Sequence, residues 1–447
     1  MPQTDNPSTD KSSPSSRRPD IIVIVADDLG YADLGCFGQT DFATPNLDRL
    51  AAGGVRFTQA YANAPLCTNT RVALMTGRYQ YRFTLGLTEP LRHPQRHRPD
   101  MGLPPEHPTL PGLLRDAGYA TALVGKWHLG ALPRFGPLKS GYDEFFGIMG
   151  GYTGYFTHLG DGGEHDLYEG ETEVERSGYV TDLLSDRASE YVRAAPADKP
   201  FLLSLHYTAP HWPWSAPSVE AASREREQDL KRAHEGGSPR IYAEMVTIMD
   251  DGIGRVLQAL RDTGRDRDTL VVFTSDNGGE RYSKIWPFVG RKRDLLEGGL
   301  RVPQIAWWPA RIAGPRVSDQ VTISMDLTAT CLEAAGIAMP SATPLDGMSL
   351  LPHLADGAPA GERALYWRMK ERGQRALRRG NWKYLRVNDR EYLYDLDYDW
   401  RERTDFADEQ PALLAELRAQ WERWDADMLP LPEEETMITA HLSRMLW

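Results

Sequence analysis

The chain has 447 residues, of which 41% are hydrophobic and 26% charged, a globular composition that excludes a mainly disordered or fibrous protein. Its net charge is −12, which disfavours nucleic acid or an anionic membrane as a partner, so an anionic ligand would need a local basic pocket. The 3 cysteines are too few and too widely spaced for a disulfide framework, and they favour a reducing compartment.

The N-terminal stretch is rich in Ser, Pro and Asp, and it predicts a loose tail over residues 1–19. It lacks the apolar segment of a signal peptide. The first apolar run, Ile21–Ala26, is far shorter than the ~18 residues of a membrane span. We therefore expect a soluble cytoplasmic protein without a membrane partner.

Apolar segments rich in β-branched residues predict strands that are covered on both faces. The first, Ile21–Val25, is followed by Asp27 and Asp28. Other strands that run into polar clusters are predicted at Tyr119–Gly125, Phe201–Leu205 and Leu270–Thr274. Helical patterns between them cover Asn46–Ala52, Thr70–Met75, Leu110–Ala117, Tyr179–Ala194 and Ile241–Asp262. This alternation predicts an α/β fold with a mostly parallel central sheet and helices on both faces, whose polar clusters meet at one edge.

The last quarter of the chain differs in composition. Pro, Ala and Gly crowd residues 338–361, which indicates a connector. Short segments between Ala364 and Leu396 are rich in Trp, Tyr and Leu and predict an antiparallel sheet, and Gln410–Met428 has an amphipathic helical pattern. We therefore predict an α/β domain at residues 20–345 and a small α+β subdomain at 346–447.

The polar clusters after the first and last predicted strands contain Asp27, Asp28, Asp276 and Asn277. Adjacent carboxylates raise one another's pKa unless a cation neutralises them. Oxygen ligands select a hard ion, and this number of carboxylates favours Ca²⁺, with Mg²⁺ as an alternative. Each pair could instead cap a loop or a helix, but two pairs at matching strand ends favour a metal site.

Cys67 lies just before the predicted helix at Thr70–Met75. The start of a helix favours an anion and lowers the pKa of a thiol. Arg71 follows about one turn later and could face the same spot. Cys36 and Cys331 are interpreted as inert buried residues, whereas Cys67 is a candidate for function.

Two lysines and two histidines could bind an anion and move protons beside a metal. Lys126 and His128 lie two residues apart at a strand end and could therefore point into one pocket. The other pair is His211 and Lys292, although His206 competes with His211 on spacing alone. Each of these residues could also be structural or solvated, so the argument for function rests on their convergence.

Several loops are further candidates for a ligand pocket. The segments Gly151–Tyr155 and Trp212–Trp214 could line a pocket for a ring, or they could pack in the core. The Arg- and His-rich run Leu91–Asp100 could attract an anion, but a solvated loop is favoured. Substrate preference is expected to depend on loops such as Tyr152–Glu175.

Taken together, these residues resemble the type I sulfatases of the alkaline phosphatase superfamily. The matching stretches occur in family order between Asp20 and Pro303 and read IIVIVADDLGYADLGCFG, ATPNLDRLAAGGVRFTQAYANAPLCTNTRVALMTGRY, ATALVGKWHLG, HYTAPHWPW, VVFTSDNGG and RKRDLLEGGLRVP. The later stretches GNWKYLRV and EYLYDL are similar to the family's C-terminal subdomain.

The resemblance implies a sulfatase that hydrolyses a small anionic sulfate ester to an alcohol and sulfate. It implies that the Ca²⁺ ligands are Asp27, Asp28, Asp276 and Asn277, with residue 67 as a further ligand. In such enzymes a formylglycine-generating maturation enzyme oxidises the cysteine, here Cys67, and the hydrate of the resulting aldehyde is the nucleophile.

The remaining site residues receive roles from the same resemblance. Arg71 would hold the nucleophile, and Lys126 with Lys292 would bind sulfate oxygens. His211 with Lys292 would assist the leaving alcohol. His128 would then take a proton from the second hydroxyl of the hydrate, which expels sulfate and restores the aldehyde.

The cysteine motif departs from the family pattern Cys-x-Pro-x-Arg, because Asn69 stands in the place of proline in CTNTR. Three interpretations stay open: maturation tolerates Asn69, Cys67 acts unmodified as a thiolate, or the chain is a non-catalytic anion-binding protein. A phosphodiesterase or phosphonate monoester hydrolase of the same superfamily is a further alternative, because the same residues could stabilise phosphoryl oxygens.

Overall fold

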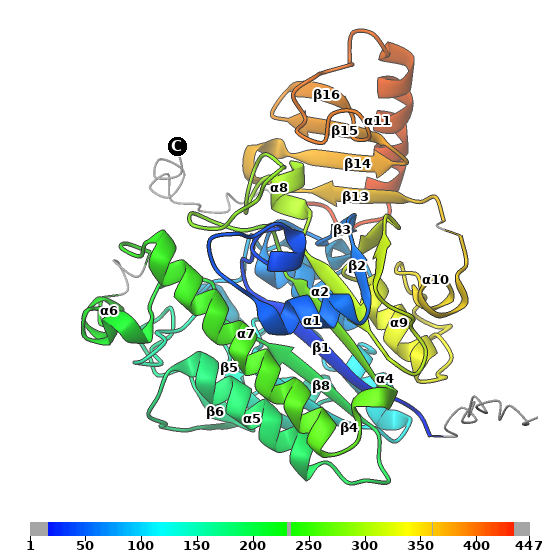
Figure 1. Ribbon diagram of the computed structural model, residues 1–447. Helices are drawn as coiled ribbons and strands as arrows, with labels where there is room; N and C mark the ends of the chain where they lie inside the picture. Colours follow the sequence, from blue (N-terminus) through cyan, green and yellow to red (C-terminus); the bar gives the residue numbers. More distant parts are fainter. Residues whose placement is uncertain (1–16, 230–233, 360, 433–447) are drawn as a thin grey trace, which may run out of the picture.

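A computed structural model describes residues 17–229, 234–359 and 361–432, so most of the predicted tail lies outside the described residues. A ten-stranded sheet of order β11-β2-β10-β9-β1-β8-β4-β5-β6-β7 runs through the larger unit (Figure 1). Its neighbouring central strands are parallel: β9 (Thr269–Ser275), β1 (Asp20–Ala26), β8 (Phe201–His206), β4 (Ala120–Lys126) and β5 (Glu144–Ile148). The predicted parallel centre is confirmed.

Shorter strands flank this parallel centre on both sides, and one strand on each side runs antiparallel to its central neighbour. On one side β10 (Gln304–Trp307) runs against β9 and β2 (Val55–Phe57), and β11 (Arg316–Ser318) is parallel to β2. On the other side β6 (Tyr168–Glu169) and β7 (Thr172–Glu173) form a short hairpin beside β5. A separate pair joins β3 (Ala60–Tyr61) to β12 (Thr322–Ile323). These strands are too short to show a pattern in the sequence.

Helices cover both faces of the sheet. One layer contains α1 (Pro45–Ala52), α5 (Val180–Ala194) and α7 (Pro239–Asp262), which lie in front of the sheet in Figure 1. The opposite layer contains α2 (Cys67–Thr76), α4 (Leu110–Asp116) and α9 (Asp326–Ala334). Ile22 and Ile24 of β1 pack into the first core, whereas Ile21 and Val23 pack into the second. This explains why β1 has no polar face.

The remaining helices are short. They are α3 (His93–Arg96), α6 (Glu220–Glu227), α8 (Glu297–Leu300) and α10 (Leu351–Asp356). Single turns of 3-10 helix occur at Gly35–Phe37, Gln80–Arg82, Thr84–Leu87, Pro137–Ser140, Pro217–Val219, Asp266–Asp268 and Glu371–Gly373. Within the described part of the chain, no helix combines the length and apolar character needed to cross a membrane.

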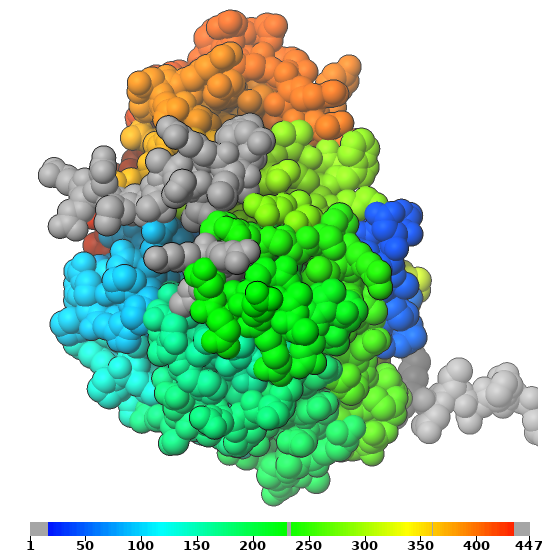
Figure 2. Space-filling view, turned by 90° about the vertical axis from the view of Figure 1, so that its left-hand side faces the viewer, coloured from blue at the N-terminus to red at the C-terminus, as the bar shows by residue number. Residues whose placement is uncertain are grey.

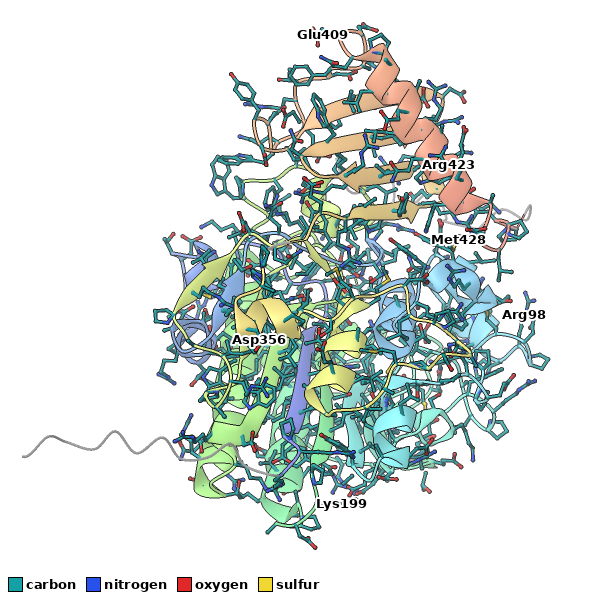
Figure 3. The ribbon with its side chains drawn as sticks, turned by 90° about the vertical axis from the view of Figure 1, so that its right-hand side faces the viewer. Arg98, Lys199, Asp356, Glu409, Arg423 and Met428 are labelled. Carbon is teal, nitrogen blue, oxygen red and sulfur yellow. The ribbon has the colours of Figure 1, made fainter. Side chains whose placement is uncertain are left out.

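The predicted connector at residues 338–361 contains α10, whose end is marked by Asp356 in Figure 3. Leu351 and Leu354 of this helix are buried in the core that also holds α9. The prediction of a connector was therefore incomplete, because a helix of six residues among Pro and Gly gives no measurable hydrophobic periodicity in the sequence. The domain boundary near residue 345 stays a prediction.

The C-terminal subdomain has the predicted antiparallel sheet, formed by β13 (Ala364–Arg368), β14 (Arg375–Arg379), β15 (Trp382–Val387) and β16 (Arg390–Asp395). Helix α11 (Pro411–Asp425) lies across one face of it (Figure 3), where Leu417 and Trp421 pack on Leu377. On the other face Trp367 packs with Tyr61 of the larger unit. The subdomain, orange in Figure 2, thus stands on one end of the molecule.

Candidate active site

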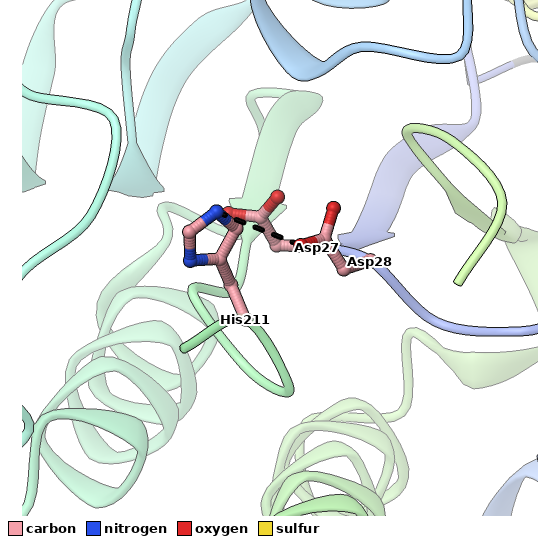
Figure 4. A group of neighbouring side chains, drawn as sticks. All are labelled: Asp27, Asp28 and His211. Atoms are coloured by element: carbon pink, nitrogen blue, oxygen red, sulfur yellow. Dashed lines mark ion pairs between the residues drawn. The ribbon is translucent and has the colours of Figure 1, made fainter. Parts of the chain in front are cut away.

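The polar residues that follow the central strands converge at one edge of the sheet. Figure 4 shows Asp27 and Asp28 directly after β1 and His211 on the loop after β8. The ligand atoms of these three residues lie within 4.8 Å of one another, and the same holds for Asp27, Cys67 and Asp276. Asp28 adopts a φ of 65°, so the chain leaves the strand geometry and both carboxylates reach the same site.

Two buried oxygen atoms at this edge have no hydrogen-bond partner. The amide nitrogen Nδ2 of Asn277 donates to Asp28 Oδ1 at 2.7 Å and to Gly278 O at 2.9 Å, which leaves Asn277 Oδ1 without a partner. Asp27 Oδ1 is also buried and without a partner. Unpartnered oxygens among several carboxylates fit a hard divalent cation. The five predicted ligands lie at this edge and could hold such an ion: Asp27, Asp28, Asp276, Asn277 and residue 67.

Two buried lysines bind these carboxylates. Lys126 Nζ donates to Asp27 Oδ2 at 2.6 Å, and Lys292 Nζ donates to Asp28 Oδ2 at 2.7 Å. Burial and the neighbouring Asp276 raise the pKa of Asp27 well above its usual value, despite Lys126. Burial also acts to raise the pKa of Asp28, but Lys292 and His211 outweigh it and lower this pKa to about 2. The two adjacent carboxyls are thus electrostatically different.

Lys292 keeps its proton. Burial acts to lower its pKa, but Asp28 and Glu280 outweigh burial and raise the pKa of Lys292. The buried ammonium group therefore presents a fixed positive charge at the site.

Cys67 is the first residue of α2 and is 2% exposed. Burial raises the pKa of its thiol, although Lys126 and Lys292 act in the opposite direction. The prediction that the helix start lowers this pKa was therefore wrong, because desolvation of the thiolate outweighs the nearby positive charges.

Arg71 lies one turn further along α2 and is 1% exposed. Its Nε and Nη2 donate to Asp276 Oδ2 at 3.1 and 2.9 Å, and its Nη1 donates to the carbonyl oxygen of Lys126 at 3.2 Å. The guanidinium group thus joins the start of α2 to the ends of β9 and β4, beside Cys67.

His128 has a φ of 57°, so the strand alternation that was expected to align it with Lys126 ends before it. It nevertheless lines the same site. Its Nε2 lies 2.8 Å from Leu91 O and 3.1 Å from Thr68 Oγ1, whereas its Nδ1 is buried without a partner. Burial, aided by Lys126, lowers the pKa of His128 well below its usual value.

His211 has one engaged and one open ring nitrogen. Its Nδ1 donates to Trp212 O at 2.5 Å, and its Nε2 lies 3.5 Å from Asp28 Oδ2 (dashed line in Figure 4). Burial and Lys292 lower the pKa of His211 well below its usual value, despite Asp28. His206 is buried at the end of β8 and is not among the residues that line the cavity. The structure thus distinguishes the two histidines.

A cavity of about 330 Å³ lies above these residues. Its aromatic wall contains Tyr152, Trp212 and Trp214, so these segments line the cavity, although Tyr155 and Trp214 also pack in the core. The ring of Tyr152 is parallel to that of His211, with 6.0 Å between the centroids. The Arg- and His-rich run is only partly a solvated loop, because Leu91, Arg92 and His93 line the cavity. Charge alone cannot show which residues of such a run turn inward.

Sequence reasoning singled out neither of the two acidic residues that line this cavity, Asp161 and Glu280. Glu280 lines it together with Cys67, His211 and Lys292. The available signal was its position directly after the DNGG stretch, at the end of a strand that carries two candidate ligands. A single carboxylate in a loop is too common to be selected by that signal.

The C-terminal subdomain binds two segments that shape the site. The carboxylate of Glu89 accepts hydrogen bonds from the backbone N–H groups of Lys370 and Glu371 at 2.6 and 3.0 Å. The side chain of Glu371 in turn binds Arg293 Nε at 3.1 Å, directly after Lys292. The same subdomain therefore supports the cavity wall near Glu89 and the loop of Lys292.

A buried ionic group strengthens this junction. Lys383 of β15 is 0% exposed and lies 2.9 Å from Glu297 and 2.7 Å from Glu402. Glu297 begins α8 of the larger unit and also accepts a hydrogen bond from Tyr61 at 2.6 Å. This ionic group links β15 to the segment that follows the Lys292 loop.

Family comparisons cover nearly the whole described chain. The sulfatase family model matches residues 19–337, and the model of the N-sulphoglucosamine sulphohydrolase C-terminal region matches residues 289–425. The second match begins before Lys292, so it includes the loop that the subdomain supports.

Relatives agree with the family match. N-acetylgalactosamine-6-sulfatase of Canis lupus familiaris is 35% identical over 78% of this chain and 68% of its own. Arylsulfatase A of Homo sapiens is 33% identical over 82% of this chain and 75% of its own. The crystal structure of Ps i-CgsB in complex with k-i-k-neocarrahexaose has a TM-score of 0.83 and 31% identity, covering 96% of this chain and 97% of that one.

A phosphonate monoester hydrolase of Agrobacterium radiobacter, with a TM-score of 0.64 and 21% identity over 92% of this chain and 96% of that one, shares the fold alone. The family model and the curated relatives, by contrast, are sulfatases over most of the chain's length. The chain therefore belongs to the sulfatase family and is a sulfuric ester hydrolase.

Proposed function

We propose that this sulfatase cleaves a sulfate ester carried by a saccharide, with formylglycine at residue 67 and a bound Ca²⁺ ion. The observation that carries the proposal is the position of Cys67, whose Sγ lies within 4.8 Å of carboxylate oxygens of Asp27 and Asp276. An aromatic wall stands beside it, as expected of a site for a sugar ring. N-acetylgalactosamine-6-sulfatases at 33 to 36% identity and a structure in complex with a neocarrahexaose support the saccharide class.

Formylglycine, when present, supplies a hydrated aldehyde whose oxygen attacks the sulfur atom. Around it, Lys126 and Lys292 bind the sulfate oxygens through their ammonium groups. Arg71 stays fixed by Asp276 and the carbonyl of Lys126, so it orients the start of α2. Fixed positive charges in a buried site stabilise the negative charge that the sulfuryl oxygens carry during the reaction.

Two histidines are placed to handle protons. Because Nδ1 of His211 donates to Trp212 O, its Nε2 is the atom that faces the leaving alcohol. This Nε2 atom and the protonated Lys292 both lie beside the carboxylate of Asp28. Because Nε2 of His128 contacts Leu91 O, its unpartnered Nδ1 is the atom that accepts a proton. The contacts of these ring nitrogens support the proton-transfer roles that we propose for His211 and His128.

Ca²⁺ fits the oxygen ligands, with Mg²⁺ as the alternative, and a bound cation would act as a Lewis acid toward a sulfate oxygen. Asp27, Asp28, Asp276 and Asn277 would hold it, with residue 67 as a further ligand. The unpartnered oxygens of Asp27 and Asn277 support this assignment.

We further propose that a formylglycine-generating enzyme accepts the motif with Asn69. Mass analysis of the peptide containing residue 67, from protein made in its own host, tests this, because conversion lowers the cysteine mass by roughly 18 Da. An unmodified thiol in protein that hydrolyses an aryl sulfate would favour catalysis by the thiolate. An unmodified thiol without hydrolysis would favour the anion-binding alternative.

The class of ester is tested on the same preparation by comparing an aryl sulfate with a phosphate diester. We expect faster hydrolysis of the sulfate, and faster hydrolysis of the diester would overturn the assignment. The cytoplasmic location is also proposed, and it favours a small substrate that can be transported. Fractionation of host cells with an antibody to the protein tests it.

A further inference from the structure

Glu280 carries a carboxylate that no other residue of the described chain binds through a hydrogen bond or an ion pair. It follows β9 by five residues and lines the cavity with Cys67, His211 and Lys292. Its Oε2 atom is buried and has no hydrogen-bond partner. Buried acceptors without partners are rare in folded proteins, so this one requires an explanation.

The cations near Glu280 already have other partners. Lys292 binds Asp28 at 2.7 Å, and Arg293 binds Glu371 at 3.1 Å. Arg281 donates to the carbonyl oxygen of His234 at 3.4 Å and lies over the ring of Trp214, 5.2 Å from its centroid. Three cationic side chains therefore lie near Glu280, but none of them binds its carboxylate directly. Burial nevertheless raises its pKa, against the pull of Lys292 and Arg293.

The backbone holds Glu280 in place. Its carbonyl oxygen accepts hydrogen bonds from Ser283 Oγ at 2.6 Å and from Ser283 N at 2.9 Å. The carbonyl of Gly279 accepts from Lys292 N at 3.0 Å. A Cβ atom at Gly278 would lie 2.1 Å from the carbonyl oxygen of Gly298, so the chain packs closely against the α8 segment. The side chain thus starts from a fixed position at the cavity.

We propose that Glu280 determines substrate specificity by accepting a hydrogen bond from a hydroxyl or N–H group on the sugar ring that carries the sulfate. An acceptor selects a donor, and a saccharide carries hydroxyl or N–H donors on the ring that bears the ester, whereas a simple aryl sulfate has none. The surrounding Lys292, Arg281 and Arg293 disfavour a cationic group, so a neutral donor is the expected partner. This inference rests on the proposed saccharide sulfatase function and adds a selecting residue to it.

The test compares two substrates on mass-verified protein: 4-nitrophenyl sulfate, which has no hydroxyl or N–H donor, and N-acetylgalactosamine 6-sulfate, whose ring carries both kinds of donor. For Glu280→Ala we expect the ratio of kcat/KM for the sugar to that for the aryl sulfate to fall about 10- to 100-fold, chiefly through a higher KM for the sugar. For Glu280→Gln we expect a smaller fall, because the amide oxygen still accepts a hydrogen bond.

A matched control is Asp161→Asn. Asp161 also lines the cavity, but its carboxylate is engaged by Arg96 at 3.2 Å and by the N–H of His93 at 3.0 Å. We expect this variant to alter the substrate ratio less than Glu280→Ala does.

The outcomes separate the two hypotheses. A wild-type protein that hydrolyses neither sulfate would contradict the proposed function itself. An active wild type whose two activities fall by the same factor in Glu280→Ala would overturn the specificity role, because Glu280 would then act only through Lys292. The specificity role would also be overturned if Glu280→Ala kept both activities and the ratio of kcat/KM between the two substrates at their wild-type values.

Discussion

Arg71 donates two hydrogen bonds to one oxygen of Asp276, from Nε at 3.1 Å and from Nη2 at 2.9 Å, and both side chains are buried. In protein freed of divalent cations, replacing Arg71 with Met would leave Asp276 without its cation. Breaking a buried pair by removing one partner costs about 3–5 kcal/mol, so we expect Arg71→Met to lower the free energy of unfolding by that amount. Urea unfolding measures it, and a loss below about 1 kcal/mol would show that the pair contributes little.

Asn69 offers a test of the maturation motif. Its Nδ2 donates to the carbonyl oxygens of Gly86 and Thr88 at 2.8 and 2.9 Å. Asn69→Pro restores the family motif within the first helical turn, where the backbone N–H has no intrahelical partner. We expect a higher formylglycine fraction by mass, together with a loss of about 1–3 kcal/mol of stability from the two abandoned carbonyls. An unchanged fraction would show that Asn69 does not limit conversion.

His128 and His206 allow a matched comparison of two buried histidines. Both have a pKa lowered by burial, but only His128 lines the cavity. We expect His128→Asn to reduce kcat on an aryl sulfate about 10²- to 10⁴-fold, the usual contribution of proton transfer. His206→Asn should reduce kcat much less in folded protein. Equal losses would remove the case for a specific role of His128.

Calcium should stabilise the fold, because it would neutralise carboxylates that repel one another. For protein treated with a chelator, we expect added Ca²⁺ to raise the Tm, with about 2.7 kcal/mol of stabilisation at 100 times the Kd. Asp27→Asn removes one ligand charge and should shift this response to higher Ca²⁺ concentrations. Thermal denaturation over a Ca²⁺ titration checks both, and identical responses of the two proteins would argue against Asp27 as a ligand.

The stability of the subdomain junction should depend on pH through Glu402. Burial and Glu297 raise its pKa from 4.5 to about 7, against the attraction of Lys383. An acid whose pKa is raised by folding stabilises the protein below its unfolded pKa, and this contribution is lost as the pH rises toward the folded value. We expect the stability of the wild type relative to Glu402→Gln to fall between about pH 5 and 7. A constant difference in urea unfolding over that range would contradict this.

The strands that carry the site were predicted to within one residue at each end. Ile21–Val25 became Asp20–Ala26, and Leu270–Thr274 became Thr269–Ser275. The reason is that a strand buried on both faces is an uninterrupted apolar run with polar residues on either side. Because parallel strands end at one edge, the meeting of Asp27 with Asp276 followed from this pattern. The chemical roles of these residues stay predictions.

Other features depend on surroundings that the local sequence does not contain. The thiol of Cys67 sits at a helix start, yet its pKa depends on burial by segments distant in the chain. His128 has a positive φ although it is not a glycine, and this conformation ends the alternation of side chains that is expected along a strand. Arg92 lines the cavity, although the charge of its segment alone favoured a solvated loop. Local patterns predict elements well, but they do not predict solvent exclusion.

The hydrogen bonds from the Lys370–Glu371 backbone to Glu89, and the ionic group of Lys383, Glu297 and Glu402, have a practical consequence for engineering. A catalytic fragment that ends before β13 would lose the contacts that support two active-site segments. Such a fragment would therefore not keep the active site of the whole enzyme. In a chimera that contains the subdomain of another sulfatase, the residues at positions 89 and 297 of the larger unit would have to be exchanged as well, so that they match the new subdomain.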